Sequence, residues 1–422
     1  MSKPLVSKNK FVRNVITLMV GTTVAQAIPI AVSPILTRIY SPDDFGVLAL
    51  FISITSILGA IVNGRYELAI MLPKEDEEAL NIVALGLLLA SILSIVLLLV
   101  VFLFGQEISG LMGNALTSDW LYLVPVSVFL IGIFNVLKFY NTRKKHYKTI
   151  ATASIYKSIV LVGTQLCFGL LKSGAAGLIS GYFFSFVIVN LQLLKSFCLY
   201  KFKEAVSFKE IKRLARLYKD FPKYSMWAAL ANTLSVNLIN VFIPILFSTA
   251  TLGFYSLVER VLGVPSALLG GAVSQVFYRE ATTEMQQTGG AVNTFNNTVQ
   301  KLVMIGLPVY LLLYLFVVDI FSIVFGEAWY VAGEYAKILI PLFFIRFVIG
   351  TVSIMNTVFL KNKNGLIFQM FLLISSVLTV TLSFYRNMSV EECLMLYTWV
   401  SIVVYLMFGL YLNSLKFGIA KL

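Results

Sequence analysis

The chain consists of long apolar runs separated by short polar or charged breaks. A helix of about 20 apolar residues crosses the roughly 30 Å hydrocarbon core of a bilayer, and most of the runs reach that length. The pattern predicts twelve spanning helices, six in each half, in an all-α integral membrane protein. The predicted spans are residues 15–37, 46–66, 80–104, 120–138, 150–171, 174–194, 225–247, 252–275, 302–325, 336–359, 365–384 and 393–414.

The first run could be mistaken for a signal peptide. Basic residues precede it, and Ala25-Gln26-Ala27 imitates a cleavage site. The apolar run continues past that site to about Thr37, which is spanning length, and another span follows directly. We therefore expect an uncleaved first helix.

The distribution of Lys and Arg predicts the orientation, because basic loops are retained on the cytoplasmic side. With the N-terminus inside, only four of the 33 Lys and Arg residues fall outside, and three lie within spans. We therefore expect both termini in the cytoplasm. The outer four are Arg38, Lys172, Lys337 and Arg386, and those within spans are Lys157, Arg260 and Arg346.

The longest hydrophilic stretch, residues 195–224, separates the two sets of six spans. It is predicted to be a basic cytoplasmic linker between an N-terminal lobe, 1–194, and a C-terminal lobe, 225–422. Residues 207–219 within it predict a short amphipathic helix, which either lies on anionic headgroups or serves only to orient the chain. Its apolar positions are Ile211, Leu214 and Leu217, and the basic residues of the stretch include Lys201, Lys203, Lys209, Lys212, Arg213, Arg216 and Lys219.

A faint self-similarity relates the two halves. Residues 41–46, Ser-Pro-Asp-Asp-Phe-Gly, lead into the second span, and residues 248–253, Ser-Thr-Ala-Thr-Leu-Gly, lead into the eighth, 207 positions later. Each half has an even number of spans, so both halves begin on the same side of the membrane. The sequence therefore predicts two six-helix lobes related by a parallel pseudo-two-fold repeat.

Composition agrees with a lipid environment and excludes several functions. Hydrophobic residues make up 59% and charged residues 13% of the chain, whereas a soluble domain carries about 25% charged residues. The net charge of +13 resides in loops between apolar runs rather than on one polar surface, so nucleic acid is not an expected partner. Three cysteines without paired spacing, Cys167, Cys198 and Cys393, and the single His146 support neither disulfides nor a metal site.

No sequence motif of catalysis or cofactor binding is present. A Walker loop, a GxSxG elbow and an HExxH motif are all missing from the sequence, and the predicted outer loops are too short for an active site. The sequence therefore favours a transporter over an enzyme, with no cofactor.

Charges within the spans are the best candidates for function. A charge at the bilayer centre costs at least about 2.5–3.5 kcal/mol unless it faces water or a partner. Arg346 lies near the middle of the tenth span with no acidic residue three or four positions away. Together with Lys157, Arg260 and Arg65, it could form a cationic cavity for an anionic group such as phosphate. Structural ion pairs and snorkelling are the alternative explanation.

Acidic and polar residues within spans extend this set of candidates. Glu259 and Asp319 could carry a coupling ion or neutralise a nearby cation. The first and seventh spans combine polar positions with prolines, which indicates bent helices lining a cavity, or hydrogen bonds within a packed bundle. The polar candidates are Gln26, Thr233, Asn237 and Asn240.

Two segments of the first spans resemble a known family. Residues 36–46, Leu-Thr-Arg-Ile-Tyr-Ser-Pro-Asp-Asp-Phe-Gly, and 64–73, Gly-Arg-Tyr-Glu-Leu-Ala-Ile-Met-Leu-Pro, are similar to the start of bacterial O-antigen and polysaccharide flippases. These belong to the multidrug/oligosaccharidyl-lipid/polysaccharide export superfamily. The six-plus-six plan extends the likeness over the whole chain.

The resemblance implies a function in lipopolysaccharide or other surface polysaccharide biosynthesis. Such a protein moves a polyprenyl-pyrophosphate-linked oligosaccharide across the bacterial inner membrane, with a cationic cavity for the anionic head. Alternating access in that family is usually linked to a gradient of H⁺ or Na⁺. The peptidoglycan-precursor flippases often have two extra C-terminal helices, which makes them a poorer match.

Two alternatives remain open at this point. A drug or small-molecule antiporter of the same superfamily would need acidic residues to dominate its cavity, whereas the span charges here are slightly basic. A membrane glycan polymerase would need a sizeable outer loop with catalytic residues, whereas the long polar stretches lie inside. Neutral sugars leave no trace in composition, so the pattern does not select among glycans.

Overall fold

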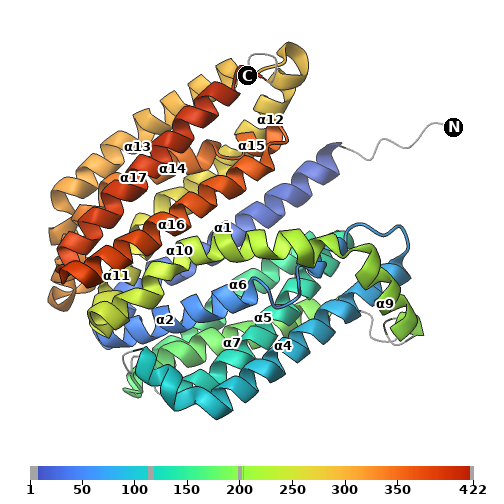
Figure 1. Ribbon diagram of the computed structural model, residues 1–422, viewed down its shortest axis with the longest axis horizontal. Coiled ribbons are helices and arrows are strands. Elements are labelled where there is room, and N and C mark those ends of the chain that lie inside the picture. Colours follow the sequence, from blue (N-terminus) through green and yellow to red (C-terminus); the bar gives the residue numbers. More distant parts are fainter. Residues whose placement is uncertain (1–7, 113–117, 198–201, 203, 419–422) are drawn as a thin grey trace. The chain divides into compact units, whose positions relative to one another are not determined.

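The computed structural model describes residues 8–112, 118–197, 202 and 204–418, and every regular element in these ranges is helical (Figure 1). Eleven helices are long and apolar enough to cross a membrane, and one bent pair supplies a twelfth crossing. The prediction of an all-α protein with twelve spans is confirmed. Of the residues singled out from sequence, Cys198, Lys201 and Lys203 lie outside the described ranges.

The chain divides into two compact units, the first ending at Thr233. Within the first unit, α6 packs against both α1 and α7, and α4 packs against α5. The helices of this unit are α1 (Lys8–Ile39), α2 (Pro42–Gly59), α3 (Tyr66–Ala69), α4 (Asp76–Leu111), α5 (Ser118–Arg143), α6 (Tyr147–Leu170), α7 (Ala175–Leu194) and α9 (Phe208–Leu217).

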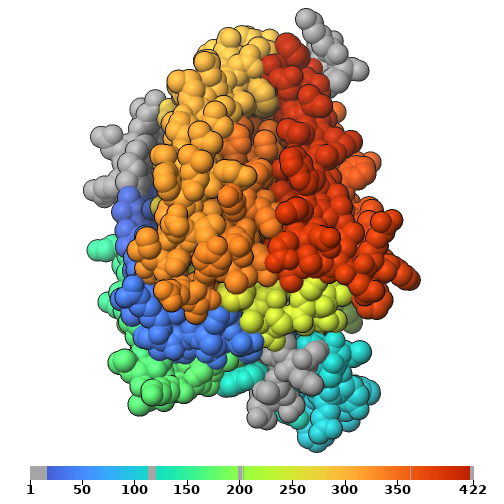
Figure 2. Space-filling view, turned by 90° about the vertical axis from the view of Figure 1, so that its left-hand side faces the viewer, coloured from blue at the N-terminus to red at the C-terminus, as the bar shows by residue number. Residues whose placement is uncertain are grey.

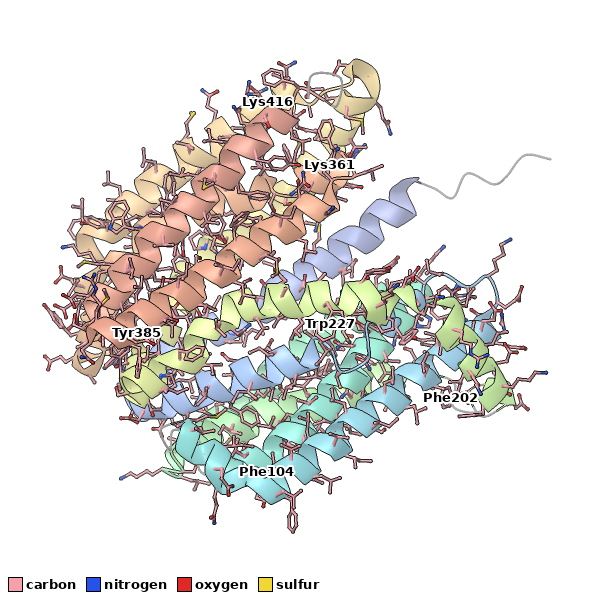
Figure 3. All side chains as sticks on the ribbon, viewed as in Figure 1. Phe104, Phe202, Trp227, Lys361, Tyr385 and Lys416 are labelled. Carbon is pink, nitrogen blue, oxygen red and sulfur yellow. The ribbon has the colours of Figure 1, made fainter. Side chains whose placement is uncertain are left out.

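The second unit begins at Leu234, within α10 (Met226–Leu246). In this unit α14 is central, because it packs against α11, α13 and α17 (Figure 1). Figure 2 shows the orange and red part of the chain, which belongs to this unit, on one face. Lys361 and Lys416 lie at one end of the unit and Tyr385 at the other (Figure 3). The helices are α11 (Thr249–Leu262), α12 (Gly271–Thr288), α13 (Val292–Ile320), α14 (Tyr330–Val352), α15 (Met355–Val358), α16 (Asn362–Arg386) and α17 (Val390–Leu415).

The self-similar segments start equivalent helices in the two units. Ser41 is the N-cap of α2, and its hydroxyl accepts a hydrogen bond from the Asp44 backbone N–H. Ser248 is the N-cap of α11 and accepts in the same way from Thr251. An N-cap side chain satisfies one of the free N–H groups in the first helical turn. The sequence repeat therefore reflects a shared way of starting the second spanning helix.

The outer surfaces of the spanning helices are apolar. On α4, Leu99, Phe102 and Leu103 are all more than half exposed, and α13 presents Met304 and Leu315 in the same way. Such surfaces would aggregate in water, so lipid is the solvent that they require. The structure thus agrees with the hydropathy of the chain.

The predicted amphipathic helix is α9, and part of its apolar face is covered by protein. Leu214 is completely buried, and Ile211 and Ala215 are partly buried against the hydrophobic core of the first unit. The Tyr66 hydroxyl donates a hydrogen bond to the Ala215 carbonyl at 2.9 Å. Leu217, the third predicted apolar position, is 59% exposed. The linker helix is therefore docked on the first unit.

The prediction that the second span continues to residue 66 is wrong. The helix α2 ends at Gly59, and a turn leads to the short helix α3. Gly64 and Arg65 both have positive φ angles, 59° and 62°, which an α-helix cannot contain. Arg65 therefore lies in the connection after the span.

Candidate functional site

The eighth span is broken beside the centre of the second unit. The helix α11 ends at Leu262, a π-helix covers Ser266–Gly270, and α12 continues at an angle of 41°. Pro265 has no N–H, so it cannot extend the ladder of helical hydrogen bonds. The Tyr310 hydroxyl from α13 donates instead to the Leu262 carbonyl at 3.3 Å. The break opens space on the side that faces α14.

A polar pocket of about 310 Å³ lies at this break. Arg346 from α14 is the charged residue in its lining, and it is half-buried, so its guanidinium can be reached from the pocket. At Gly270, Gly271 and Gly350 the wall of the pocket is formed by backbone atoms, because glycine has no side chain. The other residues lining the pocket are Ser266, Ser274, Thr351 and Tyr405.

Aromatic rings and one carboxylate surround Arg346. Its Cζ lies 5.8 Å from the centroid of the Phe343 ring, within the range of a cation–π contact. Glu259 and the tyrosines Tyr255, Tyr397 and Tyr405 interact with it electrostatically. None of the described carboxylates forms a direct ion pair with Arg346. The guanidinium therefore keeps donors for a further anion.

Glu259 is held by hydrogen bonds from two helices. The Tyr255 hydroxyl, one turn earlier on α11, donates to Glu259 Oε1 at 3.3 Å. The Asn240 side chain on α10 also bonds to this carboxylate, and Tyr397 on α17 is hydrogen-bonded to Tyr255. The cluster Asn240, Tyr255, Glu259, Arg346 and Tyr397, here called the Glu259–Arg346 cluster, thus joins residues far apart in the chain.

The other two charges of this unit lie apart from the pocket lining. Arg260 follows Glu259 on α11 and is half-buried, and successive helical residues point about 100° apart. Asp319 is exposed, one residue before the end of α13. Of the two acids proposed to neutralise Arg346, the structure thus brings Glu259 close to it.

Lys157 in the first unit is held by aromatic rings. Its Nζ lies 3.5 Å from the centroid of the Phe186 ring and 5.2 Å from that of Phe134. The Nζ atom of Lys138 also lies over the Phe134 ring, 5.7 Å from its centroid. In the described ranges no carboxylate is ion-paired with Lys157. The charge is half-buried, and the ring faces stabilise it.

Arg65 forms a local ion pair rather than part of a cavity wall. Its guanidinium lies 3.3 Å from Glu67 Oε1, and the Glu67 side chain is only 4% exposed. Burial raises the pKa of the Glu67 carboxyl above its ordinary value, although its own backbone N–H and Arg65 oppose this shift. The structural explanation therefore fits Arg65 better than substrate binding.

The predicted polar stripes have mixed surroundings. In the first stripe, Gln26 on α1 is exposed. In the second stripe, the Thr233 hydroxyl donates to the Ala229 carbonyl of its own helix, and Asn237 is half-buried. Asn240 belongs to the Glu259–Arg346 cluster. Each stripe therefore contains residues with different roles.

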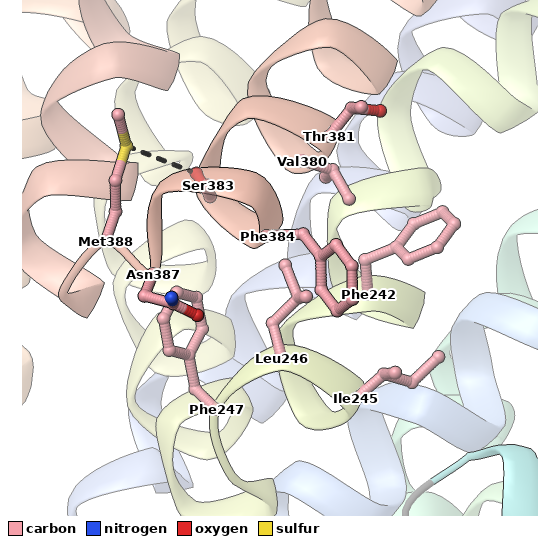
Figure 4. A pocket seen from close by; sticks show the side chains of 10 residues that line it. All are labelled: Phe242, Ile245, Leu246, Phe247, Val380, Thr381, Ser383, Phe384, Asn387 and Met388. Carbon is pink, nitrogen blue, oxygen red and sulfur yellow. Dashed lines mark hydrogen bonds between the residues drawn. The ribbon is translucent and has the colours of Figure 1, made fainter.

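A second kind of pocket lies at the ends of α10 and α16 (Figure 4). It has a volume of about 450 Å³ and is lined mainly by aromatic and aliphatic side chains, without a charged residue. Ser383 donates a hydrogen bond to the Met388 sulfur across its wall at 3.7 Å. This pocket therefore lacks the positive charge that lines the pocket at Arg346.

The comparison with protein families matches residues 35–334, and the family is described as polysaccharide biosynthesis protein. The chain belongs to this family. The match runs from the end of α1 into α14, and so covers most of the first unit and about half of the second. A sequence comparison with curated proteins gives no match.

Solved structures show the same fold as this polysaccharide biosynthesis protein. The lipid II flippase MurJ, in an inward closed conformation, matches with a TM-score of 0.73 and 11% identity over 95% of this chain and 87% of that one. An inward-facing multidrug resistance MATE family transporter matches with a TM-score of 0.60 and 14% identity over 95% of both chains. A transporter from Pyrococcus furiosus matches with a TM-score of 0.55 and 12% identity over 95% of both chains. The fold is that of the multidrug/oligosaccharidyl-lipid/polysaccharide superfamily, as predicted.

The contribution of tyrosines to the surroundings of Arg346 was not predicted from the sequence. Tyrosine is usually enriched at the two membrane interfaces, where its hydroxyl meets water. Tyr405 instead lies near the middle of the predicted span 393–414, whereas Tyr255 and Tyr397 lie within five residues of a span end. The depth of Tyr405 is a signal that could have pointed to the site, because a buried hydroxyl needs a partner.

Proposed function

We propose that this protein moves a polyprenyl-pyrophosphate-linked oligosaccharide from the cytoplasmic to the outer leaflet by alternating access of its two lobes. The O-antigen repeat unit or another surface polysaccharide repeat unit is the cargo. One observation carries the proposal: Arg346, deep in a spanning helix, lines a polar pocket and has no directly paired carboxylate among the described residues. Membership of a polysaccharide biosynthesis family supports a glycan cargo.

The pyrophosphate head is assigned to Arg346. A guanidinium can donate two parallel hydrogen bonds to phosphate oxygens, which a lysine cannot do. The hydroxyls of Ser266 and Ser274 in the same pocket can donate further bonds. Lys157 is a second cationic candidate for the head, because its charge has no acidic partner in the described residues. The exposed amide of Gln26 is available for sugar hydroxyls.

Coupling to an ion gradient is assigned to Glu259. A carboxylate beside a cation can alternate between attracting that cation and binding H⁺ or Na⁺. When Glu259 is neutralised by the ion, Arg346 is left with a stronger preference for an anionic ligand. Binding of the ion at Glu259 would therefore change the affinity of Arg346 for the pyrophosphate, and the pyrophosphate would change the affinity for the ion by the same factor. Asp319 lacks this setting because its side chain is exposed at a helix end.

The protein is assigned to the bacterial inner membrane with both termini in the cytoplasm. Basic loops support this orientation, and Lys361 and Lys416 lie together at the end of the second unit that it places inside (Figure 3). Loading from the cytoplasmic leaflet then takes place at the basic end of the molecule.

A reconstitution experiment tests the proposal. The purified protein in proteoliposomes receives a fluorescent polyprenyl-pyrophosphate oligosaccharide, and an impermeant quencher measures how much of it crosses the bilayer. We expect rapid crossing compared with empty liposomes, and no uptake of a cationic dye. Dye transport without lipid movement would contradict the proposal and favour the drug antiporter. A longer glycan formed from the supplied oligosaccharides would favour the polymerase.

A further inference from the structure

An apolar groove of about 350 Å³ lies between α16 and α17. It is rich in aromatic side chains, and the Phe368 and Phe408 rings stack at a centroid distance of 4.0 Å with 11° between their planes. Tyr411 continues the series, 6.1 Å from Phe408 and inclined by 18°. The rim is apolar and exposed: Ile367 is 45% and Met407 62% exposed. The stacked Phe368 and Phe408 rings are themselves buried, whereas the Phe371 ring in the same lining is 54% exposed. The groove therefore opens toward the lipid through this ring and the aliphatic rim.

A chain of shared residues links this groove to the Arg346 pocket. A middle pocket of about 480 Å³ has Ser274, Gly350 and Tyr405 in common with the Arg346 pocket. It has Phe368 and Phe408 in common with the apolar groove. Along α17, Tyr405, Phe408 and Tyr411 follow at intervals of three residues, about 4.5 Å of helix rise each. The arginine thus lies at one end of this series of pockets and the mainly apolar, lipid-facing groove at the other.

We infer that this groove holds the polyprenyl chain of the substrate while the pyrophosphate lies beside Arg346. The inference rests on the proposed function and adds a binding site to it. A lipid pyrophosphate joins its anionic head to its apolar chain directly, so a site for it must place a cation pocket next to an apolar channel. Each isoprene unit has a flat double bond with a methyl branch, which packs well on aromatic planes.

The position of the groove agrees with loading from the cytoplasmic leaflet. Asn364 begins the groove near the start of α16, and its side-chain amide donates to the Tyr411 hydroxyl near the end of α17 at 2.7 Å. In the proposed orientation both helix ends are cytoplasmic. This hydrogen bond closes the inner end of the groove, so the chain leaves sideways into the inner leaflet.

Filling the groove tests the inference. In Ile367→Trp the indole occupies the groove, whereas Leu378→Trp places the same group at an exposed position of α16 outside it. The probe is undecaprenyl phosphate, titrated against the full-length protein in nanodiscs, with bound lipid counted by native mass spectrometry. We expect Ile367→Trp to weaken binding by about tenfold or more, since blocking contacts of two methylene groups has that effect. Leu378→Trp should bind like wild type.

Other outcomes separate the inference from the proposed function. Equal binding by wild type and Ile367→Trp would overturn the groove and leave the transport proposal standing. Displacement of undecaprenyl phosphate by equal amounts of phosphatidylglycerol would also overturn it, because the groove would then hold ordinary acyl chains. No binding by the wild type would count against the proposed function itself. If Ile367→Trp does not fold, Met407→Trp on the facing helix tests the same groove.

Discussion

The Tyr255 hydroxyl and the Glu259 carboxylate, one turn apart on α11, are hydrogen-bonded at 3.3 Å, and Glu259 interacts electrostatically with Arg346. Tyr255 is almost completely buried, so this bond fixes the acid within the bundle rather than at its surface. Glu259 itself is half-buried, and an acid that is positioned by neutral donors can change its charge without losing its place. The relationship therefore suits a coupling role better than a purely structural one.

Neutralising the acid separates these roles. Glu259→Gln keeps the shape and much of the hydrogen bonding, so we expect normal abundance in the membrane and transport that no longer responds to an imposed H⁺ or Na⁺ gradient. The measurement compares crossing rates in proteoliposomes with and without each gradient. Low abundance that is restored by adding Arg346→Ala would instead show a structural ion pair, because removing one partner leaves the other charge buried.

The Arg65–Glu67 pair is expected to act on stability. Arg65→Ala leaves the Glu67 charge buried without its cation and should lower the free energy of unfolding by roughly 1–3 kcal/mol, reduced by the partial exposure of Arg65. Thermal unfolding in detergent measures the loss, and the double variant with Glu67→Gln should recover most of it. Unchanged stability together with lost transport would assign Arg65 to the substrate after all.

The raised pKa of Glu67 gives this site a pH dependence of known sign. A carboxyl whose pKa is higher in the folded state contributes stability below its unfolded pKa, and that stability is lost as pH rises through the folded pKa. Relative to Glu67→Gln, the wild type should therefore lose unfolding free energy as pH rises from acidic to neutral. A constant difference between the two proteins across that range would contradict the assignment.

Asn81 is expected to hold the linker on the first unit. Its amide donates to the Ala205 carbonyl at 2.8 Å, and its Oδ1 accepts from the Ser207 backbone N–H at 2.9 Å. Asn81→Ala removes both bonds from a buried position, so α9 should open more often and trypsin should cleave there faster. The test is digestion of inside-out vesicles. Tyr66→Phe, which removes only the bond to Ala215, should have a smaller effect.

Much of the fold could be predicted because lipid imposes strong local rules. Each span must satisfy its own backbone hydrogen bonds and present about 20 apolar residues, so its position can be predicted from a single window of sequence. Eleven predicted spans correspond to single helices, and the eighth, 252–275, corresponds to the bent pair. Its break was missed, although Gly263 and Pro265 mark the position. Hydropathy does not register a bend, because both sides of it remain apolar.

The site was less predictable because it depends on contacts between distant helices. Arg346 was identified from its depth alone, since a charge there needs a wet surface or a partner. Which of Glu259 and Asp319 comes near it depends on how α11, α13 and α14 pack, and single-span patterns do not contain that information. The aromatic surroundings of Lys157 follow from α5 and α7 meeting α6, which is also a tertiary property.

The direct test of the central claim is the crossing rate of the polyprenyl-pyrophosphate oligosaccharide for Arg346 variants in proteoliposomes. Arg346→Ala should slow crossing by about a hundredfold, because it removes charge-assisted hydrogen bonds worth roughly 1.5–3 kcal/mol each. Arg346→Lys should retain part of the rate, since it keeps the charge but not the planar fork. Lys337→Ala, an exposed position of the same helix, serves as the control and should behave like wild type. Crossing at the wild-type rate by folded Arg346→Ala would contradict the account.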